Sequence, residues 1–167
     1  IDAVVAEAVD RCRVVAAAKG ITVDVSDDRL AVVYGDADLL MTAVRNLVDN
    51  AVAYSGNGTR VSVTTSRHHG IVEVAVTDEG VGIPEDEQAR VFERFYRVDP
   101  ARSRTTGGTG LGLAIVKHVC ANHGGEATVW SRTGQGSTFT MRLPEAADRR
   151  NDAVRVDAVF DEIGGDG

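Results

Sequence analysis

The sequence has few cysteines, few aromatic residues and no long apolar run. Its 167 residues include only Cys12 and Cys120, which are far apart and lie in helix-like segments. This spacing argues against a disulfide framework or a cysteine metal site, and we expect two buried thiols in a reducing compartment. No apolar stretch approaches the ~20 residues that cross a bilayer, and the N-terminus lacks a signal-peptide pattern. We therefore expect a soluble chain.

Basic residues are also scarce. There are 18 Lys and Arg residues against 25 Asp and Glu residues, and between Val33 and Glu85 the basic side chains are Arg45, Arg60 and Arg67. This balance argues against nucleic acid as a partner. A hydrophobic content of 43% fits one globular domain. The chain starts without methionine and within a helical pattern, so we expect a fragment of a longer protein.

The apolar spacing predicts an alternation of helices and strands. Helices are expected at residues 1–18, 36–54 and 111–122. Strands are expected at residues 21–25, 60–66, 71–77, 127–129 and 139–143, with 30–34 as a further candidate. We expect one domain over residues 1–147. Residues 148–167 are acidic and predict a disordered tail, with a short partner-docking helix as the alternative.

Residues 107–113 form a glycine-dense turn that leads into an apolar helix. Glycines let the backbone approach a phosphate, and a helix start offers unpaired N–H groups. A plain turn is the competing interpretation. The spacing fits neither common phosphate motif, because Leu113 stands both where a Rossmann fingerprint needs glycine and where a P-loop needs lysine.

Three other segments have unusual compositions. Asn46 and Asn50 lie four residues apart on one helix, where two poor helix formers indicate a function over simple solvent exposure. Asp78 ends a strand before two glycines, which fits either an Asx turn or a carboxylate that accepts a hydrogen bond from the adenine amine. Residues 91–97 are the densest aromatic cluster, and the polar segment 98–106 after them is either a lid over phosphates or an ordinary loop.

Taken together in this order, these segments resemble the ATP-binding catalytic domain of sensor histidine kinases. Residues 46–51, 78–83, 92–97 and 108–113 match the Asn box, first glycine box, Phe box and second glycine box. Residues 134–139 match the last glycine box. The resemblance covers residues 1 to about 145 and extends to DNA gyrase, a class of heat-shock chaperones and the MutL proteins. Within this family, the sequence most resembles the phosphate-responsive sensor kinases.

The resemblance implies a two-layer α/β sandwich of the Bergerat type, in which a mixed sheet of about five strands is backed by three helices and a Gly-rich lid. It also implies that ATP and Mg²⁺ bind between the Asn helix and this lid. Asn50 would bind Mg²⁺, Asn46 would assist it, and Tyr54 would stack on adenine. Asp78 and Thr138 would read the adenine amine.

The same resemblance assigns the phosphate side of the site. Arg97 is the implied partner of the γ-phosphate and, with Asn46 and Asn50, makes up the implied catalytic set. The implied lid glycines are Gly108, Gly110 and Gly112. The remaining implied ATP contacts are Gly80, Gly82, Ile83, Phe95, Thr109, Leu111 and Leu113.

Two positions decide between functions. ATP-hydrolysing relatives use glutamate to activate water where this chain has Asn46, which lacks a basic lone pair, so the sequence favours a kinase over a hydrolase. Relatives often carry a basic residue where this chain has Ala53, and its loss leaves open a regulatory module that binds nucleotide without useful transfer. A serine kinase of the same fold is a third hypothesis, which Asn46 disfavours.

No histidine of the chain has the setting of a phospho-acceptor. The four histidines are His68, His69, His118 and His123. The resemblance therefore implies that the acceptor histidine lies on a dimerisation domain absent from this chain, and that a response regulator is the downstream partner. It also implies a homodimeric parent anchored in the membrane, with this domain in the cytoplasm.

Overall fold

The structure is a computed structural model that describes residues 1–26, 31–98 and 109–146. Its described strands form one five-stranded sheet in the order β1-β2-β3-β5-β4. The strands are β1 (Thr22–Ser26), β2 (Arg60–His68), β3 (Ile71–Asp78), β4 (Glu126–Arg132) and β5 (Gly136–Pro144). Strands β1 and β2 are parallel and the other neighbours are antiparallel. The expected mixed sheet is confirmed.

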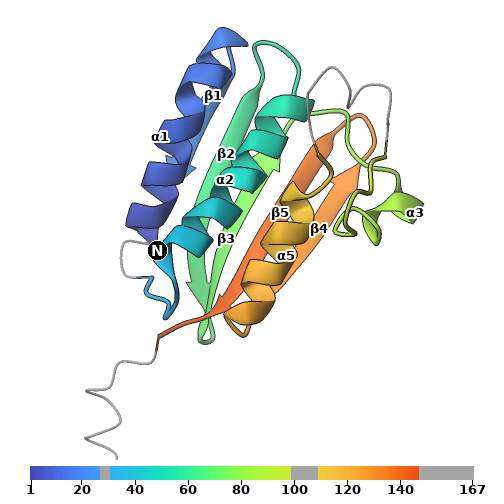
Figure 1. Cartoon of the computed structure of the whole chain (residues 1–167). Coiled ribbons are helices and arrows are strands. Elements are labelled where there is room, and N and C mark those ends of the chain that lie inside the picture. Colours follow the sequence, from blue (N-terminus) through green and yellow to red (C-terminus); the bar gives the residue numbers. More distant parts are fainter. Residues whose placement is uncertain (27–30, 99–108, 147–167) are drawn as a thin grey trace, which may run out of the picture.

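Three long helices cover one face of this sheet (Figure 1). They are α1 (Asp2–Ala18), α2 (Ala37–Tyr54) and α5 (Gly112–Asn122), and a short helix α3 (Glu85–Gln88) lies beside the β4–β5 hairpin. The other face of the sheet carries mostly polar side chains, such as Thr128 of β4. This arrangement confirms the two-layer α/β sandwich.

The core lies between the helices and the sheet because both contribute side chains with the matching period. Strand β3 buries every second residue, Val72, Val74 and Val76, and α2 buries an apolar stripe that includes Leu47 and Val48. Burying a side chain of this size stabilises the fold by about 1.5–3 kcal/mol. The helical and strand periods in the sequence therefore locate most of the core.

Helix α2 is held at both ends. At its start the Asp36 carboxylate accepts hydrogen bonds from the backbone N–H groups of Asp38 and Leu39, at 2.9 and 3.1 Å. Near its end the Lys19 ammonium donates to the carbonyl oxygens of Ala53 and Ser55, at 3.3 and 2.9 Å, and also to that of Val52. A cation at a helix C-terminus is favourable because the last carbonyls are unpaired and carry a partial negative charge.

The candidate strand at residues 30–34 is wrong for the described residues 31–34, which form no strand. Their backbone binds Ile1 and Ala146 instead. The Ala31 carbonyl accepts a hydrogen bond from the amino group of Ile1, and the Val32 carbonyl accepts one from the Ala146 N–H. Among the described residues, no helix has the length and apolar character that a membrane span requires.

Candidate functional site

The residues implied in nucleotide binding gather at one end of the sheet. Strand β3 ends there at Asp78, β5 begins at Gly136, α2 ends at Tyr54 and α5 begins at Gly112 (Figure 1). The sequence places these residues far apart, and the topology of the sheet and its helices brings them together. The C-terminal end of β5 lies at the opposite end of the sheet.

Asp78 is a buried carboxylate at this end. Its side chain points to the helix-covered face and the residue is 4% exposed. Burial raises the pKa of Asp78 above its ordinary value of 3.8, and hydrogen bonds from the backbone N–H groups of Gly80 and Ser137 oppose that shift. The Gly80 N–H donates to the carboxylate at 2.8 Å. A carboxylate held by two amides in a partly apolar setting is suited to accept a further hydrogen bond from a ligand.

Gly80 brings the end of α2 next to this carboxylate. A Cβ atom at Gly80 would lie 2.7 Å from the Asp78 Oδ1 atom and 2.7 Å from the Tyr54 carbonyl oxygen. No side chain fits there, which explains why the residue two positions after the carboxylate is glycine. Tyr54 is half-buried at this junction. The structure therefore brings Asp78, Gly80 and the backbone of Tyr54 together.

Gly82 and Ile83 continue this loop along the β4–β5 hairpin. Gly82 has a φ of 70°, and a Cβ atom there would lie 2.1 Å from the Arg132 carbonyl oxygen. The Ile83 N–H donates to the Ser131 hydroxyl at 2.8 Å. Gly82 and Ile83 therefore both lie against the hairpin through their backbones.

Asn46 and Asn50 lie on α2 along the side that faces α5. The Asn46 Oδ1 atom is 3.0 Å from the place of a Cβ on Gly112, so the start of α5 lies against the first asparagine. The Asn46 amide also donates to the Thr42 carbonyl at 2.9 Å. Asn50, one helical turn nearer to Tyr54, is half-buried. The structure therefore places Asn46 against the first residue of α5.

The Phe box and the second glycine box are in direct backbone contact. The Phe95 N–H donates to the Gly110 carbonyl at 2.8 Å, and a Cβ on Gly110 would lie 2.9 Å from the Phe95 Cα atom. Phe95 has a φ of 64° and is 67% exposed, whereas the Phe92 ring packs edge-on against Phe139 at 6.1 Å. The Phe92 side chain thus packs the Phe box against the core, whereas the Phe95 side chain is exposed.

The other lid residues are placed only in part. Thr109 is exposed and its hydroxyl accepts from the Leu111 N–H at 3.4 Å, while Leu111 and Leu113 are half-buried. Arg97, the last residue of the Phe box, is half-buried. Gly108, like the rest of residues 99–108, lies outside the described residues.

Thr138 does not lie beside Asp78, and this implied contact needs correction. Side chains alternate along β5, so Thr138 lies on the face away from the helices, and its hydroxyl is 2.9 Å from that of Thr77. The residue that pairs with Asp78 across the strands is Ser137, which is 5% exposed. The expectation for Thr138 is therefore wrong by one position along β5.

Three polar residues at the site carried no local signal in the sequence. Ser131 and Gln88 bind the backbone of the first glycine box, and Lys19 binds the end of α2. Ser131 contacts Ile83 across 48 residues of chain, Lys19 contacts Ser55 across 36, and Gln88 contacts Ile83 across 5. Such contacts follow from tertiary structure and not from residue spacing.

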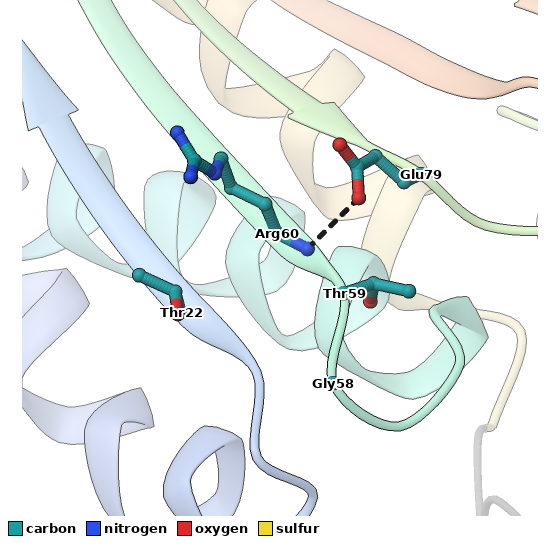
Figure 2. A pocket seen from close by; sticks show the side chains of 5 residues that line it. All are labelled: Thr22, Gly58, Thr59, Arg60 and Glu79. Carbon is teal, nitrogen blue, oxygen red and sulfur yellow. Dashed lines mark hydrogen bonds between the residues drawn. The ribbon is translucent and has the colours of Figure 1, made fainter.

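Two surface hollows are lined by other residues, although the larger one includes Glu79, which lies between Asp78 and Gly80. The larger, about 330 Å³, is lined by Thr22, Gly58, Thr59, Arg60 and Glu79, and in it the Arg60 N–H donates to the Glu79 carboxylate at 3.1 Å (Figure 2). The other, about 260 Å³, lies near Gly124 and Arg142. Neither is lined by Asn46, Asn50 or Asp78. The candidate site is thus defined by its donors and acceptors.

The side chains near the asparagines suit a metal that arrives with its ligand. In the described part of the chain, no group of three or more His, Cys, Asp or Glu residues could hold a metal ion by itself. Asn50 offers an amide oxygen, and Mg²⁺ is commonly bound through one or two protein oxygens together with substrate phosphates and water. The donor set therefore fits Mg²⁺ bound with a nucleotide.

Comparison with known proteins identifies the fold and the family. Residues 35–147 match the family described as histidine kinase-, DNA gyrase B- and HSP90-like ATPases. The structure of the mycobacterial sensor histidine kinase MprB superposes with a TM-score of 0.75 at 34% identity, covering 88% of this chain and 95% of that one. The structure titled full-length ShkA in complex with AMPPNP gives a TM-score of 0.76 at 31% identity, covering 89% of this chain and 30% of that one.

Curated relatives agree with this assignment and are much longer. Sensor-like histidine kinase SenX3 of Mycolicibacterium smegmatis is 55% identical over 148 residues, which are 89% of this chain and 38% of that protein. Sensor histidine kinase WalK of Bacillus subtilis is 41% identical over 75% of this chain and 21% of its own length. The chain therefore belongs to the histidine kinase-, DNA gyrase B- and HSP90-like ATPases, as an ATP-binding catalytic domain of the sensor histidine kinase type.

Proposed function

We propose that this chain binds ATP with Mg²⁺ and transfers the γ-phosphoryl group to a histidine on a dimerisation domain outside the chain. The observation that carries the proposal is the Asp78 carboxylate, buried at the end of β3 and held by the Gly80 N–H at 2.8 Å beside the end of the asparagine helix. The phosphorylated histidine then passes its phosphoryl group to a response regulator. The parent is a membrane-anchored homodimer, of the phosphate-responsive type, with this domain on the cytoplasmic side.

The base side of the site selects adenine. The Asp78 carboxylate accepts a hydrogen bond from the exocyclic amine, which guanine does not present at that position. Ser137, the buried hydroxyl that pairs with Asp78 across the strands, takes the second polar role in place of Thr138. Tyr54 stacks on the ring from the end of α2. Gly80 leaves the backbone open to a flat ligand, because a side chain there has no room.

The phosphate side positions the reacting group. Asn50 holds Mg²⁺, which neutralises the phosphate charge, and Asn46 supports it from one helical turn away. Arg97 and the backbone of residues 108–113 bind the γ-phosphate. Phosphoryl transfer depends mainly on positioning and charge neutralisation, so the protein needs no nucleophile of its own. The neutral imidazole of the acceptor histidine attacks the γ-phosphorus in line, so that an N–P bond forms as the bond to the β,γ-bridging oxygen breaks and ADP leaves. The amide at position 46 does not activate water.

Transfer to a separate histidine domain tests this proposal. We expect that the chain, mixed with a cognate dimerisation domain and γ-labelled ATP, yields a phosphoprotein that is labile to acid and stable to base. An acid-stable phosphate would instead support transfer to serine. No label on the acceptor, from a chain that binds ATP, would contradict the kinase proposal.

One observation favours a second candidate function. Ala53 stands where relatives often carry a basic residue near the phosphates, and the nearby Lys19 ammonium is bound to carbonyls at the end of α2. The chain would then be a regulatory module that binds nucleotide with little transfer. A transfer rate equal to that of ordinary histidine kinases would exclude this alternative.

A further inference from the structure

Ser131 is the centre of a hydrogen-bond cluster next to the base side of the site. Its hydroxyl accepts from the Ile83 N–H at 2.8 Å, donates to the Gly136 carbonyl at 2.8 Å and lies 2.9 Å from the Ser137 hydroxyl. One hydroxyl offers one donor and two acceptor sites, so these three contacts satisfy it fully. Ser131 thereby joins the first glycine box to the start of β5.

Gln88 completes the same cluster from α3. Its side-chain amide donates to the Ile83 carbonyl at 3.1 Å and to the Ser131 carbonyl at 2.9 Å. Both the N–H and the carbonyl of Ile83 are thus bound, one by Ser131 and one by Gln88. We refer to Ile83, Gln88 and Ser131 as the polar clamp.

The polar clamp completes a closed path of hydrogen bonds and backbone that includes the Asp78 carboxylate. Asp78 accepts from the backbone N–H groups of Gly80 and Ser137. Gly80 leads along the chain to Ile83, and Ile83 is bound to Ser131, which in turn contacts Ser137. The donors that orient Asp78 therefore lie on two segments, and the clamp ties those segments together.

The clamp is placed to act on the site and not on the core. Helix α3 has four residues and none of them is buried. Gln88 and Ser131 are both half-buried, at the edge of the loop and the hairpin. Their removal leaves the apolar layer between helices and sheet unchanged, but it frees the loop that carries Gly80, Gly82 and Ile83.

We propose that Ser131 and Gln88 are positioning residues for nucleotide recognition, which fix the loop of residues 80–83 on the β4–β5 hairpin and so orient Asp78 toward the adenine amine. In this proposal neither residue contacts the nucleotide. This inference rests on the proposed function, because it assumes that Asp78 reads the base. It adds two residues whose effect is on base selectivity and not on the phosphates.

The test compares two nucleotides that differ at the exocyclic group. Binding of ADP and of inosine diphosphate, which lacks the amine, is measured by calorimetry for the 167-residue chain and for Ser131→Ala and Gln88→Leu. We expect ADP to bind about fivefold to tenfold more weakly in each variant, as befits the loss of one or two hydrogen bonds. Binding of inosine diphosphate should change less, so the ratio between the two nucleotides falls.

Three controls separate positioning from a general loss of structure. Ser131→Thr keeps the hydroxyl and should restore ADP binding. Ser66→Ala, at the far end of β2, and Asp86→Leu, on the exposed side of α3, should leave both affinities unchanged. In Ser131→Ala and Gln88→Leu, the ratio of ATP affinities with Mg²⁺ and with EDTA should also stay the same, because the phosphate side is not altered.

Unchanged selectivity for ADP in a folded Gln88→Leu chain and a folded Ser131→Ala chain would overturn the inference while leaving the proposed function intact. Equal losses for ADP and inosine diphosphate would overturn it as well, since they indicate a general effect. If the unaltered chain bound neither nucleotide, the proposed function would fail, and the inference with it.

Discussion

At the scale of single residues, the proposed site has one buried carboxylate on its base side and two amides on its phosphate side. Asp78 is kept from water, and two backbone amides partly compensate it. Asn46 and Asn50 carry no charge, so in the proposed function a metal ion and Arg97 neutralise the phosphates. This division predicts different responses to pH and to chelation.

Protonation of Asp78 should weaken adenine binding as the pH falls through its raised pKa. Burial raises its pKa above 3.8, so the folded protein binds this proton more tightly than the unfolded chain does. The ionised carboxylate therefore costs stability above its folded pKa, and that cost disappears as the pH falls toward the unfolded value. Since ADP needs the ionised acceptor, calorimetry should show ADP affinity falling in this same range.

Asp78→Asn is the matching variant for this pH dependence. Its side-chain amide presents a donor as well as an acceptor, and we expect a loss of about 2 kcal/mol or more in ADP binding at neutral pH, roughly thirtyfold. The acid-dependent part of binding should vanish with the carboxyl group. Asp86→Asn, on the exposed surface of α3, should bind ADP normally. Normal affinity in Asp78→Asn would refute its assigned role.

Asn50→Ala should remove the Mg²⁺-dependent part of ATP binding. The expected loss in the ratio of affinities with Mg²⁺ and with EDTA is at least about tenfold, as for residues that support a metal ion. Affinity in EDTA should remain similar, because the base contacts are intact. Asn57→Ala, in the exposed turn after α2, is the matched control. Unchanged metal dependence in Asn50→Ala would place the ligand at another residue.

At the scale of elements, α2 is the part that joins both sides of the site. It carries Asn46, Asn50 and Tyr54 along one side, and its two ends are fixed by Asp36 and Lys19. A further bond fixes its start to α5, because the Asp36 N–H donates to the His123 Nε2 atom at 3.0 Å. The position of the asparagines thus depends on contacts with α1 and α5.

Lys19→Met should lower the stability of the fold. The variant keeps the apolar stem but removes the ammonium that binds three carbonyls at the end of α2, and we expect a loss of about 1–2 kcal/mol in the free energy of unfolding. Urea unfolding followed by far-UV circular dichroism measures it. Lys117→Met, on the exposed side of α5, should be neutral. An equal effect in both variants would contradict the capping role.

Sequence patterns locate elements better than they locate individual polar contacts. The helix over residues 37–54 and the valine-rich strands are predicted correctly, because their apolar residues recur with the helical or strand period and are the ones that are buried. Residues 31–34 look like a strand but bind Ile1 and Ala146. Thr138 shows the other limit, because a shift of one residue in a strand moves a side chain to the opposite face.

At the scale of the whole molecule, the chain is an ATP-binding catalytic domain, and we propose that the acceptor histidine lies outside it. His69 lies in the β2–β3 turn with a φ of 52°, His118 is exposed on α5, and the His123 ring is bound to the Val119 carbonyl and the Asp36 N–H. The curated relative SenX3 of M. smegmatis is matched over 38% of its length. This agrees with a division of labour in which the acceptor histidine belongs to another domain.

Calorimetric titration of the 167-residue chain with ATP tests the central claim most directly. The titration is run with Mg²⁺, with EDTA, and with GTP in place of ATP. We expect saturable binding of ATP that is tighter with Mg²⁺, and much weaker binding of GTP, because in the proposed site Asp78 accepts from the adenine amine. Absence of ATP binding under all conditions, or equal affinity for GTP, would contradict the account.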